Sequence, residues 1–235
     1  MTMINKESKL YTIIYIVVLV VVVGSALALT SISLKDKQIE NANAAKMGQI
    51  LASVNIFPPQ DSISAYYTRF ITETCVVDQA GQTIPGGDAF AVNVQQQAAA
   101  PADGRELPVF VCTLADGAKK YILPIYGAGL WGPIWGYISV DADGSTIYGA
   151  YFAHQGETPG LGAEIEKPAF SDQFRGCHLF KNGVFMPVAV VKAGQHPAGD
   201  EDYVDGISGG TITSRGVGAM IDNCLTPYQN FLKTL

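Results

Sequence analysis

The hydrophobic pattern of this chain begins with one long apolar segment close to the N-terminus. Residues 10–34 carry no charge and are rich in Val, Ile and Leu, and a helix that crosses a bilayer needs about 20 mostly apolar residues. A buried core helix would carry polar residues on one face, and none interrupts residues 16–23. The pattern predicts a membrane anchor, with Tyr11 and Tyr15 at the interfacial aromatic belt.

A cleaved signal peptide is the alternative to an uncleaved anchor. Residues 26–28, Ala-Leu-Ala, resemble a small-x-small cleavage site behind a short head that carries Lys6, Glu7 and Lys9. The apolar run is longer than the roughly 7 to 15 residues of a signal h-region, which favours an anchor. Lysines before and after the run nearly balance, so the positive-inside rule barely decides orientation. With the head in the cytoplasm, both an uncleaved anchor and a cleaved signal peptide would place the rest of the chain on the far side of the membrane.

The next part of the chain changes from apolar to helix-friendly and polar. Residues 35–54 predict a stalk helix that ends before Pro58 and Pro59, because proline cannot continue a helix. A second polar helix is expected over residues 62–72. Residues 81–107 show little pattern and predict a loop or variable insertion to which we assign no chemistry.

Beyond residue 107 the pattern is that of short strands separated by turns. Asp143-Gly144 and Asn182-Gly183 are strong hairpin signals. A final helix is expected from about Ser214, with apolar side chains three and four residues apart and a kink at Pro227. Strands are expected over residues 109–114, 119–125, 134–140, 146–154, 179–181, 184–185 and 188–192.

These elements predict an α+β fold, an antiparallel sheet with packed helices, preceded by one N-terminal transmembrane helix. We expect a head and anchor over residues 1–34, a stalk helix and variable segment over 35–107, and a globular domain over 108–235.

Composition narrows the classes of partner. The formal net charge is −6 and the pI is about 5.0, which excludes a nucleic-acid partner, since phosphate backbones recruit basic surfaces. The four cysteines lack the spacing of a zinc or iron–sulfur site, so no metal is expected. They are interpreted as small buried hydrophobes, although an exported domain would allow a disulfide. These cysteines are Cys75, Cys112, Cys177 and Cys224.

The strongest candidate for chemistry is residues 205–214, Asp-Gly-Ile-Ser-Gly-Gly-Thr-Ile-Thr-Ser. Its glycines let backbone N–H groups approach an anion, and the start of the following helix adds a positive dipole end. A phosphate could be held there by hydrogen bonds alone or be esterified to Thr211. The alternative is a loop that only caps the helix. The four hydroxyls that converge on this region belong to Ser208, Thr211, Thr213 and Ser214.

The same segment formally matches the G-x-S-x-G motif of serine hydrolases. An α/β-hydrolase needs its histidine after the serine, yet every histidine precedes Ser208. The order His154, Asp172, Ser208 resembles that of chymotrypsin-like proteases, but about 55 residues are too few for two barrels. We therefore expect no hydrolase and assign no catalytic residue.

Two further turns present side chains suited to a flat ring. Residues 156–162, Gly-Glu-Thr-Pro-Gly-Leu-Gly, form a tight turn after a strand that can present Thr158 and Leu161 to a ligand. Residues 126–133 place Leu130 and Trp131 among small residues. An ordinary turn and a core tryptophan are the alternatives.

Taken together, residues 129–133, 157–162 and 208–211, in this order behind one membrane span, resemble the FMN-binding domain of the NqrC family, which belongs to the sodium-translocating NADH:quinone oxidoreductases. The stalk is also similar to that family around Gln38 and Asn41. The resemblance covers most of the chain except about residues 81–107.

The resemblance implies a covalent flavin. In the family, FMN is joined by a phosphoester to the threonine of a Ser/Thr-Gly-Ala-Thr motif, and a separate flavin transferase that uses FAD attaches it. That threonine matches Thr211, and Gly210 stands where the family usually has alanine. The binding positions implied are Asp205, Ser208, Gly209, Gly210, Thr213, Ser214, Glu157, Thr158, Gly160, Leu161, Gly162, Leu130 and Trp131.

The resemblance also implies a function. The chain would be an electron-transfer subunit, not active alone, in a multi-subunit complex that couples NADH oxidation by quinone to sodium export. It would cross the bacterial inner membrane once, contact lipid, and hold its FMN domain on the periplasmic side. No G-x-G-x-x-G fingerprint follows a strand, which places NADH oxidation in another subunit. The alternatives are the G subunit of the Rnf ferredoxin:NAD oxidoreductase complex and a non-redox, membrane-anchored binding domain.

Overall fold

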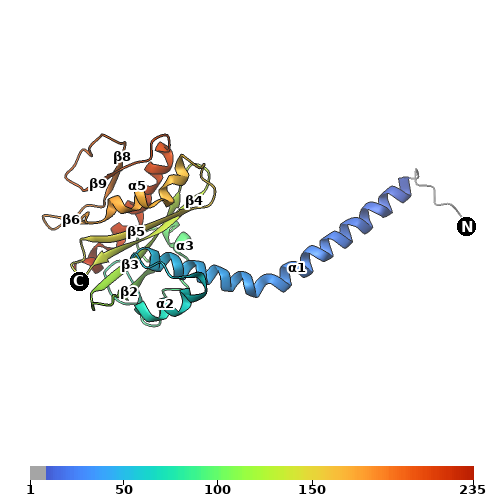
Figure 1. Ribbon diagram of the computed structural model, residues 1–235, viewed down its shortest axis with the longest axis horizontal. Helices are drawn as coiled ribbons and strands as arrows, with labels where there is room; N and C mark the ends of the chain where they lie inside the picture. Colours follow the sequence, from blue (N-terminus) through green and yellow to red (C-terminus); the bar gives the residue numbers. More distant parts are fainter. Residues whose placement is uncertain (1–8) are drawn as a thin grey trace, which may run out of the picture. The chain divides into compact units, whose positions relative to one another are not determined.

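The computed structural model describes residues 9–235 (Figure 1). The charged head predicted at Lys6 and Glu7 lies outside the described residues. By contacts the chain divides into two compact units, Met1–Ala45 and Lys46–Leu235. The division of the sequence at residues 34/35 and 107/108 stays a prediction.

Helix α1 (Lys9–Ala52) runs without interruption through the predicted anchor and most of the stalk. Its 44 residues span about 66 Å at 1.5 Å per residue. Among the described residues it is the one helix long and apolar enough to cross a membrane. Ile50 and Leu51 near its C-terminal end are buried, whereas the large apolar side chains of its anchor part are exposed, as at Val20 (63 %) and Leu29 (70 %), and so have no packing partners outside the helix among residues 9–235. Such a surface is stable in lipid and unfavourable in water.

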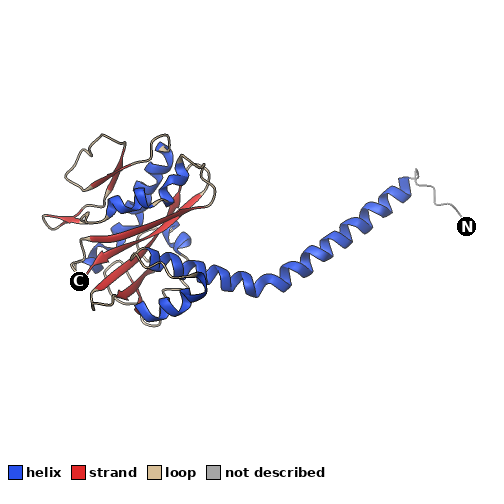
Figure 2. Cartoon of the chain, in the orientation of Figure 1, coloured by secondary structure: helices blue, strands red, loops and turns tan. Residues whose placement is uncertain are grey.

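The second unit is built on one antiparallel sheet (Figure 2). The five strands lie in sequence order, so each pairs with the next along the chain. The strands are β1 (Ile71–Val77), β2 (Leu107–Thr113), β3 (Lys119–Ala128), β4 (Pro133–Asp141) and β5 (Ile147–His154). This meander confirms the predicted α+β class with an antiparallel sheet, packed helices and one N-terminal apolar helix.

Alternate residues of these strands face two separate clusters of buried side chains, as the period of two requires. In β2, Val109 and Val111 join the larger cluster, together with the last long helix α5 (Thr211–Leu225). Phe110 joins the smaller cluster, which contains Ile50 from the end of α1. Both faces of the sheet are therefore covered, which explains why β2 and the middle parts of β3 and β4 are largely apolar.

The remaining elements are short. Helical turns are η1 (Gln60–Ser62), α2 (Ile63–Phe70), α3 (Val94–Ala99), η2 (Gly162–Glu166), α4 (Pro168–Ser171), η3 (Asp172–Phe174), η4 (Thr226–Tyr228) and α6 (Gln229–Leu232). Two small pairs of strands complete the fold, the antiparallel β6 (Phe180–Lys181) and β7 (Val184–Phe185) and the parallel β8 (Ala189–Val191) and β9 (Tyr203–Asp205).

Two local predictions were wrong in part, and one strand was not predicted. The second helix is present but ends at Phe70, and the β-branched run that follows it forms β1, because pairing with β2 outweighs local helix propensity. The segment over residues 81–107 contains α3, whose first turn is capped by the Asn93 side chain, which accepts the Gln96 N–H at 3.1 Å. Strand β9 was not predicted, because its partner β8 is remote in sequence.

The predicted hairpin turns are confirmed. Asn182 and Gly183 both have positive φ, 52° and 77°, as a two-residue type I′ turn requires. Asp143 holds the β4–β5 turn, because its carboxylate accepts the N–H groups of Ser145 and Thr146 at 2.9 and 2.8 Å. Burial alone would raise the pKa of Asp143, but these hydrogen bonds and the charge of His178 lower it below the ordinary value.

All four cysteines are free, and those at 112 and 224 are buried. Burial raises the pKa of the Cys112 thiol to about 11, so it stays protonated at neutral pH. The interpretation as small buried hydrophobes is confirmed for Cys112 and Cys224, whereas Cys75 and Cys177 are only partly buried.

The aromatic packing under β5 gives a first prediction. The Phe152 ring lies 5.4 Å from that of Phe170 and 5.1 Å from that of Phe174, centroid to centroid. Phe152→Ala should lower the free energy of unfolding by roughly 3–5 kcal/mol, because it leaves a cavity. The matched control Phe57→Ala removes a side chain that is 76 % exposed and should change it by less than about 0.5 kcal/mol. Denaturant unfolding of the full chain in detergent, followed by tryptophan fluorescence, measures both. Equal losses in the two variants would contradict this packing.

The Asp143 turn gives a second prediction. Asp143→Asn should cost about 1 kcal/mol at pH 7, since an amide oxygen is the weaker acceptor. A carboxylate with a lowered folded pKa contributes stability above its unfolded pKa of about 3.9 and loses that contribution as the pH falls through the folded pKa. The difference between wild type and variant should therefore shrink below about pH 4. Thermal unfolding across pH tests this, with Asp103→Asn as the exposed control. A difference that stays constant down to acid pH would refute it.

Candidate functional site

Three segments meet beside the first turn of α5 and enclose a cavity of about 230 Å³. They are the β3–β4 turn, the segment after β5 and the start of α5. We call this cavity the apolar cleft. Its lining consists of Leu130, Trp131, Glu157, Thr158, Leu161, Gly162, Gly209, Gly210, Thr211, Ile212 and Thr213. The fold thus brings together the three sequence motifs, which lie far apart along the chain.

Large apolar side chains around the cleft remain open to solvent. Trp131 is 69 % exposed, Ile212 55 %, Leu130 49 % and Leu161 42 %. Trp131 and Leu130 form the tip of the β3–β4 turn, which the Gly129 N–H closes by donating to the Gly132 carbonyl at 2.8 Å. Such a surface is suited to packing against a flat apolar ring.

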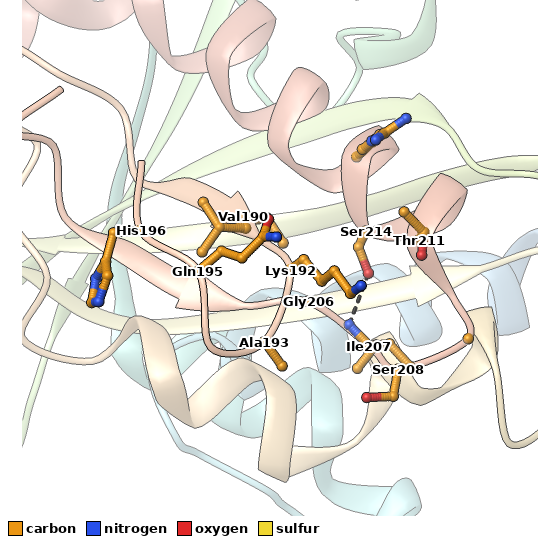
Figure 3. Close-up of a pocket in the computed structure, with 13 residues that line it drawn as sticks. Val190, Lys192, Ala193, Gln195, His196, Gly206, Ile207, Ser208, Thr211 and Ser214 are labelled. Atoms are coloured by element: carbon orange, nitrogen blue, oxygen red, sulfur yellow. Dashed lines mark hydrogen bonds between the residues drawn. The ribbon is translucent and has the colours of Figure 1, made fainter. Parts of the chain in front are cut away.

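A second and larger cavity, of about 560 Å³, borders the same loop that precedes α5 and shares Gly209 and Thr211 with the apolar cleft (Figure 3). We call it the cationic pocket. Lys192 points across it toward Ser214 and Thr211 (Figure 3). Neither Lys192 nor Arg215 has a carboxylate partner within 4 Å in the described part of the chain. The lining residues are Val190, Val191, Lys192, Ala193, Gln195, His196, Gly206, Ile207, Ser208, Gly209, Thr211, Ser214 and Arg215.

Thr211 lines both cavities. It is the first residue of α5, three residues before the predicted start at Ser214. Gly210 occupies the N-cap position, and no side chain caps the helix. The idea that this hydroxyl run merely caps a helix is therefore wrong, and the unpaired N–H groups of the first turn remain available to an anion.

The four hydroxyls of this segment divide into two pairs. Thr213 and Ser214 are buried, and both are hydrogen bonded within the protein. The Thr213 hydroxyl donates to Glu157 Oε2 at 2.6 Å. Ser214 Oγ accepts the Ile207 N–H at 2.8 Å (Figure 3). Ser208 and Thr211 are exposed at the cavities. Helical geometry turns successive side chains by about 100° and so separates Thr211 from Thr213.

Glu157 is a charged group within the wall of the apolar cleft and is only 5 % exposed. Its Oε1 accepts the Trp131 N–H at 2.8 Å. Burial alone would raise the pKa of Glu157, but hydrogen bonds from Thr213 and the backbone of Trp131 and Leu130, with the charge of His154, lower it below the ordinary value. Glu157 is therefore ionised at neutral pH.

The carboxylate of Glu157 also explains two glycines of the motifs. A side chain at Gly129 would collide with Oε1, and one at Gly162 would collide with Oε2. Only glycine lets both turns approach the buried charge this closely.

Two of the predicted binding residues line neither cavity. Asp205 ends β9, where its backbone N–H and carbonyl bind the Gln173 side chain at 2.9 and 3.3 Å. Gly160 supplies a positive φ of 75° to its turn and donates to Glu164 Oε1 at 3.0 Å. Asp205 and Gly160 therefore contribute to the site only indirectly, through the backbone conformation of β9 and of the turn after β5.

Other lining residues were not predicted. Arg215 follows Thr211 by four residues, so a helix start at Thr211 would have placed both on one face. Lys192 and His196 belong to the segment between β8 and β9, and no local pattern indicated that this segment borders Thr211. Only the β8–β9 pairing brings it there.

The geometry does not support a hydrolase. His154 Nδ1 accepts the Glu157 N–H at 3.1 Å, and no hydrogen bond links Ser208 to a histidine within residues 9–235. The partners that would activate a serine nucleophile are not assembled.

Comparisons with known proteins agree with this geometry. The FMN-binding domain family matches residues 129–226. The C subunit of the Na(+)-translocating NADH-quinone reductase of Yersinia pestis is 34 % identical over 232 residues, with 91 % of this chain and 87 % of the relative covered. The corresponding protein of Vibrio anguillarum is 31 % identical over 229 residues, with 91 % and 89 % covered.

Solved structures show the same fold. The C subunit of the reductase of Parabacteroides distasonis ATCC 8503 is 50 % identical, with a TM-score of 0.80, over 86 % of this chain and 98 % of that chain. NqrC of Shewanella oneidensis, 23 % identical with a TM-score of 0.68 over 83 % and 98 %, supports the fold alone. From identity above 30 % across about nine-tenths of both chains, this chain belongs to the NqrC family, the C subunits of the Na(+)-translocating NADH-quinone reductases.

Proposed function

We propose that this chain is an electron-transfer subunit that carries FMN, bound covalently through a phosphoester to Thr211. The observation that carries the proposal is the position of the Thr211 hydroxyl. It is exposed at the start of α5 and borders both the apolar cleft and the cationic pocket. The other threonine of the motif, Thr213, is buried and committed to Glu157. Thr211 is therefore the acceptor we favour.

The residues present fit FMN, because each part of the cofactor has a matching environment. Exposed apolar side chains at Trp131, Leu161 and Ile212 offer a surface to the ring. Lys192 and Arg215, which have no carboxylate partners among the described residues, offer charge compensation to a phosphate on Thr211, and the first turn of α5 offers N–H groups. When bound, FMN supplies reversible electron transfer.

The chain's own residues would retain, orient and tune the cofactor. A bond to Thr211 keeps the carrier from diffusing away between electron transfers. Thr158, Leu161, Leu130 and Trp131 line the apolar cleft and would contact the ring. Because these side chains are at the surface, a ring bound there would stay accessible for short-range electron exchange with another protein.

The family relationship extends the proposal to the cell. We infer that α1 anchors the chain in the bacterial inner membrane as a single span, with the FMN domain on the periplasmic side. The partners would be the other subunits of a complex that couples NADH oxidation by quinone to sodium export, a flavin transferase that attaches FMN, and membrane lipid. The chain would have no complete activity alone. The names of the relatives favour this complex over the Rnf alternative.

Attachment at Thr211 is directly testable. Full-length protein coexpressed with a flavin transferase should give a band that fluoresces under ultraviolet light after denaturing electrophoresis, with an intact mass increased by one FMN ester. Thr211→Ala should lose the fluorescence completely, because the acceptor oxygen is gone. Thr226→Ala, which changes an exposed threonine at the other end of α5, is the matched control and should keep it. A dark wild-type band would overturn the proposal, and a labelled Thr211→Ala would place the bond elsewhere.

The role of the two cations gives a further prediction. The double variant Lys192→Gln and Arg215→Gln should slow the attachment of flavin about tenfold, the effect of losing about 1.4 kcal/mol of stabilisation of the phosphate. A time course of labelling, quantified by flavin fluorescence, measures the rate. The control Arg69→Gln removes a cation on α2 that lines neither cavity. Equal labelling rates in the double variant and the control would contradict a role of Lys192 and Arg215 in binding the phosphate.

A further inference from the structure

Glu157 links the three segments that form the walls of the apolar cleft, namely the β3–β4 turn, the segment after β5 and the start of α5. Oε1 binds the β3–β4 turn through the Trp131 N–H at 2.8 Å, and Oε2 binds the start of α5 through the Thr213 hydroxyl at 2.6 Å. The backbone N–H of Glu157 donates to His154 Nδ1 at the end of β5, at 3.1 Å. Among the described residues that line the cleft, no other side chain forms hydrogen bonds to two of the three segments besides its own.

The charge of this carboxylate is not neutralised by an ion pair. No Lys, Arg or His nitrogen lies within 4 Å of it among residues 9–235. A buried carboxylate without a cation is costly and persists only where hydrogen bonds satisfy it. A neutral side chain such as glutamine would make the same links at lower cost, so the charge itself calls for a functional explanation.

We propose that Glu157 is the positioning residue of the apolar cleft, and that its fixed negative charge lowers the reduction potential of the flavin held there. The inference rests on the proposed function, because it assigns Glu157 to the site of that flavin. A flavin that gains electrons also gains negative charge or must take up protons. A carboxylate in the wall of its site raises the energy of the reduced form by Coulomb repulsion.

Glu157→Gln distinguishes the effect of the negative charge from the effect of the hydrogen bonds that position the segments. The glutamine oxygen can accept the Trp131 N–H, while its NH2 group donates to the Thr213 hydroxyl, which is able to accept. The links between the walls are thus kept and the charge is lost.

The first experiment is a spectroelectrochemical titration of the full-length flavinylated chain in detergent. Glu157→Gln should raise the ratio of reduced to oxidised flavin about tenfold at a fixed potential, a positive shift of about 30 mV for a two-electron couple. Glu73→Gln is the matched control, since it removes an exposed carboxylate on β1 that pairs with Lys119 at 3.3 Å. It should leave the potential unchanged. An unchanged potential in Glu157→Gln would overturn the role of the charge.

The second experiment tests the positional role and needs no flavin. The chain contains two tryptophans, so a Trp135→Phe background makes Trp131 the sole fluorophore. In unflavinylated full-length protein, Glu157→Ala should lower the fluorescence anisotropy of Trp131, because the turn loses its link, and Glu157→Gln should not. Thr213→Val, with Thr213→Ser as its control, removes the bond that anchors the carboxylate to α5, so the carboxylate should hold the turn less firmly and the anisotropy of Trp131 should fall as well. This variant replaces Glu157→Ala if that variant does not fold. Equal anisotropy in wild type, Glu157→Ala and Thr213→Val would overturn the positional role.

The two experiments also distinguish this inference from the proposed function. A wild-type chain without flavin would overturn the proposed function and, with it, the role of the charge. The anisotropy measurement would still decide whether Glu157 holds the walls together. A flavinylated chain with unchanged potential and anisotropy would overturn this inference and leave the proposed function standing.

Discussion

The site depends on the packing of helix α5 against the sheet. Val217, Ile221 and Leu225 repeat at spacings of four and are fully buried in the larger cluster. Cys224 adds a polar link to β3, because its Sγ accepts the Tyr126 N–H and donates to the Tyr126 carbonyl, both at 3.4 Å. These contacts fix both the position of the helix along its own axis and its rotation about that axis. Its first residue, Thr211, therefore lies where the β3–β4 turn and the segment after β5 converge.

Two cavities of different chemistry then share one exposed hydroxyl. One is lined by large apolar side chains and the other by two cations without carboxylate partners in the described part of the chain. A ligand with a flat ring at one end and a phosphate at the other matches this pair of environments better than a purely apolar or purely anionic one. The separation is a consequence of helical rotation, which turns Thr211 outward and commits Thr213 and Ser214 to internal hydrogen bonds.

Glu157 is buried and hydrogen bonded to two neighbouring segments, while the large apolar side chains around the apolar cleft stay exposed. Trp131 is mostly exposed, yet its backbone N–H is tied to a carboxylate inside the wall. The turn is thus held through its main chain, and its side chains remain free to contact a ring or another protein. This arrangement suits a carrier that must bind its cofactor firmly and still exchange electrons at its surface.

Much of the architecture followed from local patterns in the sequence. The apolar run of α1, the strand-like segments of β2 to β5 between turn residues, and the hairpin signals at residues 143–144 and 182–183 each depend on neighbouring residues alone, so they could be predicted. Strand β8 was predicted within residues 188–192, but β1, β9 and the β8–β9 pairing depend on partners remote in the chain, and they were missed. The motifs at residues 130–131, 157–162 and 208–211 likewise named most of the residues that line the apolar cleft.

By itself, then, the sequence determined the membrane-type helix, the strand pattern and the residue types available for chemistry. Only the tertiary structure decided which hydroxyl faces outward, that Lys192 and Arg215 border it, and that one buried carboxylate joins all three walls. The physical reason is that local patterns arise from backbone geometry within one element. The environment of a side chain is set by elements that meet only when the core is packed.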